Sequence, residues 1–181
     1  MRCLTVHRPW AGCFFRSRFA KDVENRGRIT HVRGPLLIHA GLAYDDRAQV
    51  FIYRITRDNP PENAGGFILG KVELWDCVPP TNVESFDPPL PCSPWHEHGA
   101  WGWRVRNPVR FQEPIPYKGS QGFYDVPTYV YVWGNNEKRL GLKGRECVVL
   151  KRMKKNSVAV IFLDDGHMEI TSRNALRRSR T

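Results

Sequence analysis

Residues 4–41, LTVHRPWAGCFFRSRFAKDVENRGRITHVRGPLLIHAG, place a short apolar helix, a charged segment and a buried strand in close succession. Pro9 suits the first turn of a helix, where its missing N–H leaves no hydrogen bond unmade. The run 36–38 follows Gly34-Pro35 and is typical of a core strand that ends at His39. The apolar face of the helix is predicted from the helical spacing of Trp10, Cys13 and Phe14. The charges fall between the two apolar elements, and this layout is typical of a site.

The charged segment, residues 21–26, alternates in the way that an extended strand requires. Lys21, Val23 and Asn25 would then lie on one face of the strand, with Glu24 and Arg26 on the other. A bulge or turn could still bring Lys21 and Glu24 together. Spacing alone favours a solvated salt-bridge cluster here, because runs of charge usually face water.

The rest of the chain is made of short apolar runs separated by proline and glycine, with 14 prolines and 15 glycines in all. This pattern favours strands over a helical bundle. One amphipathic helix is predicted over residues 43–57, and the proline-rich stretch 79–94 is expected to be a surface loop. A polar turn is predicted at residues 117–122 and a junction at 134–136. Strands are predicted over residues 67–78, 101–111 with a break at Asn107-Pro108, 129–133, 146–152, 157–163 and, after a hairpin turn at Asp165-Gly166, 167–171.

The positive charge is concentrated in the C-terminal quarter. The whole chain carries a formal net charge of +10 with a pI near 9.7. Residues 138–181 hold 12 lysines and arginines against 4 aspartates and glutamates and end in the arginine-rich segment 173–180. Such a balance favours a polyanionic partner, chiefly nucleic acid, with an anionic membrane as the lesser alternative. The distribution of charge thus distinguishes a nearly neutral, aromatic-rich part of the chain from a basic C-terminal extension.

The five cysteines are widely spread and contain no Cys-x-x-Cys pair, which is typical of reduced thiols in a cytoplasmic protein. The sequence shows neither a signal-peptide pattern nor an apolar stretch of about 18 residues, so we expect no membrane partner. Cys92, His96 and His98 are residue types that zinc accepts, but their spacing matches no structural zinc pattern. No metal and no cofactor are predicted.

Several motifs together resemble a known family. These are His7-Arg8-Pro9-Trp10-Ala11, Lys21-x-x-Glu24-x-Arg26, Arg33-Gly34-Pro35-Leu36-Leu37-Ile38-His39-Ala40, Gly70-Lys71-Val72-Glu73-Leu74, Gly99-Ala100-Trp101-Gly102-Trp103 and Gly119-Ser120-Gln121-Gly122-Phe123. In this order they resemble ASCH domains, a branch of the PUA-like β-barrels associated with RNA and other nucleic acids, over roughly residues 3–128. The chain departs from the family pattern at Phe19, where glycine is usual, and at Arg8, where glutamine is common.

The resemblance implies an α+β fold, a PUA-like β-barrel of the ASCH type with about two flanking helices. It assigns residues 1–134 to this domain and leaves residues 135–181 as a basic β-hairpin extension, which we expect to be SH3-like. The implied function is intracellular binding of single-stranded RNA or DNA, or of a modified nucleoside, in a pocket between the first helix and the barrel. The sequence ranks neither RNA against DNA nor one oligomeric state against another.

The pocket residues follow from the matched motifs. Lys21 and Arg26 would meet a phosphate or the polar edge of a base, and Glu24 would accept from an exocyclic amine. Tryptophan at the edge of a cleft can stack a base, although most of the six tryptophans must belong to the core. The predicted nucleic-acid-binding set is His7, Trp10, Lys21, Glu24, Arg26 and Trp101.

Two enzymatic alternatives are also implied. One ASCH-like group deacetylates N4-acetylcytidine with a lysine, a threonine and a glutamate, for which this chain offers Lys21, Glu24 in the threonine's place, and Glu73. Glu24 could there activate water as a general base. Another ASCH-like branch cleaves single-stranded RNA with a divalent metal, for which Glu24 and Glu73 could be ligands. A third alternative is a protein-interaction module without affinity for nucleic acid.

Overall fold

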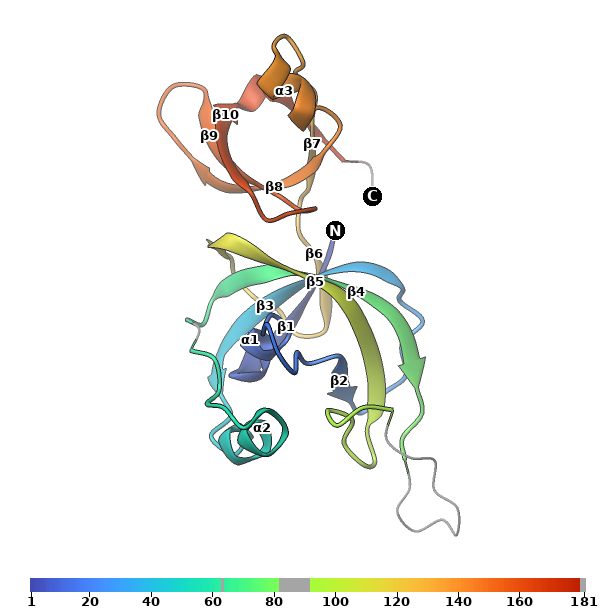
Figure 1. Cartoon of the computed structure of the whole chain (residues 1–181). Coiled ribbons are helices and arrows are strands. Elements are labelled where there is room, and N and C mark those ends of the chain that lie inside the picture. Colours follow the sequence, from blue (N-terminus) through green and yellow to red (C-terminus); the bar gives the residue numbers. More distant parts are fainter. Residues whose placement is uncertain (63, 82–91, 180–181) are drawn as a thin grey trace.

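The protein folds around two sheets, shown one above the other in Figure 1. The computed structural model describes residues 1–62, 64–81 and 92–179. The first sheet has six strands in the order β2-β5-β4-β3-β1-β6. Its strands are β1 (Arg2–Arg8), β2 (Val23–Arg26), β3 (Gly34–Tyr44), β4 (Phe67–Val78), β5 (Trp101–Pro116) and β6 (Phe123–Asp125).

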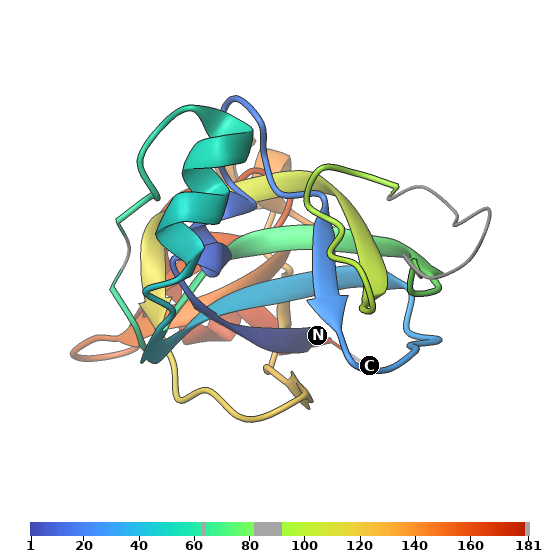
Figure 2. The ribbon, with the colours of Figure 1, turned by 90° about the horizontal axis from the view of Figure 1, so that it is seen from below.

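The second sheet has five strands in the order β10-β9-β8-β7-β11. They are β7 (Tyr129–Tyr131), β8 (Glu146–Arg152), β9 (Ser157–Phe162), β10 (Met168–Ser172) and β11 (Leu176–Arg178). The helices are α1 (Trp10–Cys13), α2 (Ala48–Thr56), α3 (Glu137–Leu142) and the short 3₁₀ helix Arg173–Ala175. Seen from below, α2 and β2 lie apart on the side of the first sheet that faces away from the second sheet (Figure 2).

The connections of the first sheet bring the opening motif onto one side of it. β1 pairs with β3 in parallel, so the chain must cross over between them, and this crossover carries α1 and β2. All other pairings in the first sheet are antiparallel. The predicted α+β class is confirmed. A closed barrel is not confirmed, because within the described residues the end strands β2 and β6 each pair on one side only.

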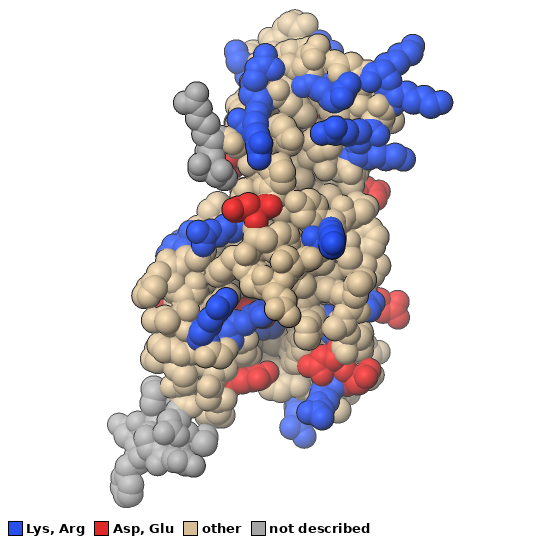
Figure 3. Space-filling view, turned by 180° about the vertical axis from the view of Figure 1, so that it is seen from behind, with Lys and Arg blue, Asp and Glu red and all other residues tan. Residues whose placement is uncertain are grey.

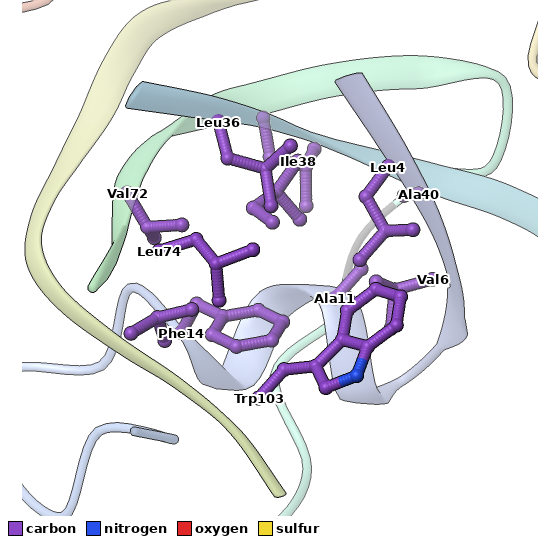
Figure 4. Packing of buried hydrophobic residues seen from close by; sticks show 12 residues of the cluster. Leu4, Val6, Ala11, Phe14, Leu36, Ile38, Ala40, Val72, Leu74 and Trp103 are labelled. Atoms are coloured by element: carbon purple, nitrogen blue, oxygen red, sulfur yellow. The ribbon is translucent and has the colours of Figure 1, made fainter. Parts of the chain in front are cut away.

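The main core lies between α1 and the first sheet. Figure 4 shows its side chains pointing toward one another from both elements. Trp103 is 2% exposed, stacks on Phe123 with ring centroids 5.1 Å apart, and donates from Nε1 to the Arg28 carbonyl (2.9 Å). This core fixes α1, and therefore the site that follows it, against the sheet. Its buried members include Leu4, Val6, Ala11, Phe14, Leu36, Ile38, Val72 and Leu74.

A second core cluster is shared by the two sheets. It contains Cys3, Leu37 and Ile68 from the first sheet together with Val148 and Ile161 from the second. The first strand of the second sheet, β7, already begins at residue 129, before the predicted junction at 134–136. The two sheets therefore bury apolar surface against each other.

The local predictions succeed where one pattern dominates. The predicted bounds 67–78 and 146–152 are those of β4 and β8. The predicted helix 43–57 begins only at Ala48, because the chain up to Tyr44 continues β3. The predicted loop 79–94 is described only in part, since residues 82–91 lie outside the described residues.

One local prediction is wrong, and one helix was not predicted. The strand 101–111 is not broken at Asn107-Pro108, because β5 runs without interruption to Pro116. Asn107 takes a left-handed φ of 51°, and the register with β4 shifts nearby, so the irregularity is absorbed inside the strand. Helix α3 was not predicted, although Asn136 caps it by accepting from the Arg139 N–H (2.9 Å). Among the described residues, no helix is long and apolar enough to span a bilayer.

Candidate functional site

A cavity of about 890 Å³ opens beside the opening motif. Its walls come from β1, α1, β2, the segment just before β2, β3 and the turn 117–122. Elements that are far apart in the sequence therefore meet here because the crossover and the β1–β6 pairing bring them together. The lining includes His7, Trp10, Lys21, Glu24 and Arg26, which are five of the six residues predicted to bind nucleic acid.

The centre of the site is a carboxylate held between two cations. Glu24 lies 3.1 Å from the Lys21 ammonium through Oε2 and 2.9 Å from the Arg26 guanidinium through Oε1. Lys21 also donates to the Val23 carbonyl. Lys21 is 4% exposed and Glu24 is 7% exposed, so the cluster is not the solvated surface that spacing alone favoured. Buried charges of this kind persist only when their partners replace the lost water.

The backbone before β2 explains how Lys21 and Glu24 meet. The strand begins only at Val23, so Lys21 lies in the preceding turn rather than on the opposite face of the strand. The Lys21 N–H donates to the Cys13 carbonyl (2.9 Å) and ties this turn to α1. Phe19 has a φ of 52°, a left-handed conformation that favours the glycine usual at this position in ASCH domains. The turn geometry is therefore adopted here despite the larger residue.

Trp10 is a fixed wall of the cavity. Its Nε1 donates to Asp45 (2.9 Å), and its ring makes edge contacts with Phe51 and Trp95 at centroid distances of 5.6 and 6.4 Å. The Lys21 ammonium lies 5.8 Å from the centroid of the same ring. These contacts hold the indole in one orientation, so a ligand meets a preformed surface.

Arg26 is held over the core. Its guanidinium donates to the Thr5 carbonyl (3.0 Å) and lies 5.7 Å from the centroid of the Trp103 ring. β2 pairs with β5 so that Glu24 is opposite Trp103 and Arg26 is opposite Trp101. The long strand β5 therefore sets the position of both charged side chains.

A buried histidine forms another wall. His39 is 2% exposed, and its Nε2 donates to the Tyr117 carbonyl (2.9 Å), since a carbonyl only accepts. In the neutral ring Nδ1 then accepts from the Thr5 hydroxyl (3.3 Å). Gly119 lies against this ring, and a Cβ there would come within 2.5 Å of His39 Cε1. Only glycine lets the turn 117–122 pass this close.

Acidification is expected to destabilise the protein through His39. Burial lowers the pKa of His39, so the unfolded chain, with a pKa of about 6.5, takes up a proton at a pH where the folded protein does not. The free energy of unfolding should therefore fall as the pH drops through that range and level off below the folded pKa. Urea unfolding at about pH 7.5 and about pH 5.5 measures the difference.

His39→Gln should reduce this pH dependence, because glutamine does not titrate. His31→Gln is the matched control, since His31 is exposed and lies outside the cavity. An unchanged pH dependence in His39→Gln, equal to that of the control, would show that His39 does not carry the effect.

Two predicted site residues do not line the cavity. Glu73 accepts from Arg106 (2.8 and 3.1 Å) and from Asn107 (2.8 Å), and the Arg106 hydrogen bond lowers the pKa of its carboxyl. Trp101 is half-buried and packs against the main core. Of the residues named for catalysis, the cavity therefore brings together Lys21 and Glu24 but not Glu73.

No family model matches the chain. The sequence is 27% identical over 137 residues to Activating signal cointegrator 1 of Homo sapiens. The match covers 71% of this chain and 23% of the human protein, so the chain spans less than a quarter of that relative. This distant similarity supports the ASCH resemblance of the opening motif in part.

The sequence analysis missed His39, Asp45 and the turn 117–122 as parts of the site. The turn was predicted as polar, but its place in the cavity depends on the pairing of β6 with β1, which no local pattern reveals. Asp45 sits just after β3 and reaches the site only through its hydrogen bond to Trp10. Each of these residues reaches the cavity through tertiary contacts, which a local sequence pattern does not reveal.

Cys92, His96 and His98, which are of residue types that zinc accepts, do not form a set of metal ligands. Cys92 Sγ lies 3.5 Å from His96 Nδ1, while His98 bonds Thr81 (2.9 Å) instead. Within the part of the chain that the structure describes, no group of three or more His, Cys, Asp and Glu side chains is placed to hold a metal ion.

Proposed function

We propose that this protein binds single-stranded nucleic acid, or a modified nucleoside, with one base held in the cavity beside Trp10. The observation that carries this proposal is the buried Glu24 carboxylate between Lys21 and Arg26 on the wall of a cavity of about 890 Å³. Cavities of about 300–1,000 Å³ with a few convergent polar groups are the usual size of small-ligand sites. The ASCH resemblance, which the distant human relative supports in part, also favours this assignment.

The charged cluster has hydrogen-bonding capacity left for a base. Each oxygen of Glu24 has one cationic partner, so each retains a lone pair for an amino group of a base. Arg26 has five N–H donors, of which only some are used by Glu24 and Thr5. A base edge with both an amino group and a carbonyl would therefore complement Glu24 and Arg26 together.

The C-terminal sheet supplies a second reason to expect a polyanion. Figure 3 shows lysine and arginine side chains gathered over this sheet, at the top of the view. Residues 138–178 contain eleven lysines and arginines and four acidic residues. Ion pairs within the described residues engage Lys138 and Arg145. The cationic hairpin between β8 and β9, residues 151–155, would meet the phosphate backbone of the strand that carries the bound base.

A hydrolase acting at the same cavity is the second candidate function. The observation that favours it is the contact between Lys21 and Glu24, since a carboxylate beside an ammonium can activate water for attack. Glu73 has no part in this version, because it bonds Arg106 and Asn107 instead. A cytoplasmic location also remains a prediction.

Lys21→Met is expected to weaken binding of a short single-stranded RNA or DNA by about tenfold or more, because charge-assisted hydrogen bonds are worth roughly 1.5–3 kcal/mol. Lys71→Met is the matched control, since Lys71 lies on β4 outside the cavity. The titration follows tryptophan fluorescence with RNA, DNA and duplex at two salt concentrations. Lys118 is exposed and also lines the cavity, so Lys118→Ala tests the same cavity with a substitution that should not destabilise the fold.

Unchanged affinity in both Lys21→Met and Lys118→Ala would remove the cavity from the binding site. Unchanged salt dependence after Lys154→Glu with Lys155→Glu would remove the basic hairpin, because each lost phosphate contact should lower the slope by roughly 0.7 on a single strand. Cleavage of the RNA on a denaturing gel, lost in Glu24→Gln, would favour the hydrolase. Absence of any binding would favour the protein-interaction module.

A further inference from the structure

A second, smaller cavity adjoins the first. It has a volume of about 360 Å³ and lies between the segment 20–22 and the paired strands β4 and β5. Lys21 lines both cavities, so the two spaces lie on adjacent sides of this one residue. Its walls otherwise come from different residues than those of the first cavity, chiefly Trp75, Arg104 and Arg106.

The wall of the second cavity is an aromatic and guanidinium platform. The Arg104 guanidinium lies 4.2 Å from the centroid of the Trp75 ring, and that of Arg106 lies 5.4 Å from it. Trp75 is half-buried and stands on the face of β4 opposite to Val72 and Leu74, which belong to the main core. Trp75 is therefore not needed to fill the core.

The two arginines are fixed by carboxylates on the same face. Arg106 is held by Glu73 through two hydrogen bonds of 2.8 and 3.1 Å. Arg104 is 3.6 Å from Asp76, which also faces Arg33 at 3.9 Å. Arg33 and Arg104 thus share the Asp76 carboxylate, while the Arg104 guanidinium lies over the Trp75 ring. Planar groups held in this way stack with any nucleobase, since every base has a π-face.

We propose that the second cavity takes the nucleotide next to the one in the first cavity, with its base stacked on Trp75 and Arg104. This inference rests on the proposed function, because a strand must first place a base beside Trp10. The platform offers flat faces, and the Asp22 carboxylate that also lines this cavity already accepts a hydrogen bond from the Ser93 hydroxyl, so this subsite should tolerate all four bases. The first cavity would then bind the nucleotide whose base is selected, and the second cavity would bind the adjacent nucleotide of the same strand.

The test compares how the full chain binds a mononucleotide and how it binds a longer strand. Wild-type protein, Trp75→Ala and Trp133→Ala are titrated with cytidine 5′-monophosphate by calorimetry and with fluorescently labelled hexacytidylate and hexadeoxycytidylate by anisotropy, because cytosine carries both an amino group and a carbonyl. Trp133 is the matched control, because Arg139 lies 4.9 Å from its ring in the same kind of pair but outside both cavities. Trp75→Ala should weaken hexamer binding by about 5- to 150-fold, the loss of one stacked base, and leave the mononucleotide unchanged.

Arg104→Lys gives an independent reading, because it keeps the charge but removes the planar face. It should also weaken hexamer binding without changing the mononucleotide. Hexamer affinity equal to wild type in both Trp75→Ala and Arg104→Lys would overturn the second subsite while leaving the proposed function standing. If the wild type binds neither probe, the proposed function fails and the second subsite fails with it. Equal weakening by Trp133→Ala would show that the effect is not specific to this cavity.

Discussion

Glu24→Ala lowers the free energy of unfolding by about 3–5 kcal/mol, the loss expected when one partner of a buried ion pair is removed. Lys21 is almost fully buried, and Glu24 is the only carboxylate found within 4 Å of its ammonium among the described residues. Without that carboxylate the Lys21 charge keeps only the Val23 carbonyl and the faces of Trp10 and Phe14. Urea unfolding followed by circular dichroism measures the change.

Two control variants separate burial from charge. Glu73→Ala breaks a more exposed ion pair with Arg106 and should change stability far less than Glu24→Ala, because water and salt screen exposed pairs. Lys21→Met combined with Glu24→Leu removes both buried charges and should recover most of the loss, because apolar pairs of similar volume often replace buried ion pairs without cost. If Glu24→Ala lowers the free energy of unfolding no more than Glu73→Ala does, the Lys21 ammonium must be hydrated in the folded protein.

Trp103→Ala is expected to destabilise the protein by about 3–5 kcal/mol, as for other large aromatic residues removed from a core. The side chain is 2% exposed, stacks on Phe123 and supports the Arg26 guanidinium. Its removal should therefore also weaken ligand binding at the first cavity, because Arg26 loses the surface that holds it. Thermal unfolding and the fluorescence titration described above read the two effects separately.

Trp103→Phe and Trp101→Ala are the matched controls for this prediction. Phenylalanine keeps the stack on Phe123 but loses the hydrogen bond to the carbonyl of the exposed Arg28, at a cost of about 0.5–1.5 kcal/mol for one hydrogen bond. Trp101 lies on the same strand but is only half-buried, so its removal should cost less than that of Trp103. Equal losses from Trp103→Ala and Trp101→Ala would contradict the assigned packing.

The predicted site residues that line the first cavity are those that lie close together in the chain. His7, Trp10, Lys21, Glu24 and Arg26 fall within twenty residues and reach one cavity because the end of β1 and the crossover that follows it carry them. Lys21 and Glu24 can meet only because the strand begins after Lys21. The sequence allowed a turn at this point, but the alternation of residues 21–26 did not require one.

Glu73 and Trp101 lie outside the first cavity for reasons of strand geometry. Successive side chains on a strand face opposite ways, so Glu73 and Trp75 face away from the core side occupied by Val72 and Leu74. The register between β4 and β5 also shifts at several positions, and no local pattern predicts which residues then lie opposite. The space near Arg26 was filled by Trp103 rather than by Trp101.

The shared cluster of Cys3, Leu37, Ile68, Val148 and Ile161 has a consequence for how a long ligand would bind. A bivalent protein with a flexible linker holds its second binding surface at an effective concentration set by the linker. Here no such linker intervenes, because the sheet that carries the cavity and the sheet that carries the basic hairpin are packed together. A strand long enough to reach both surfaces would engage the second intramolecularly, whereas a shorter strand would gain nothing from it. If the proposed function holds, the packed junction would therefore make the affinity of the protein depend on strand length as well as on the bound base.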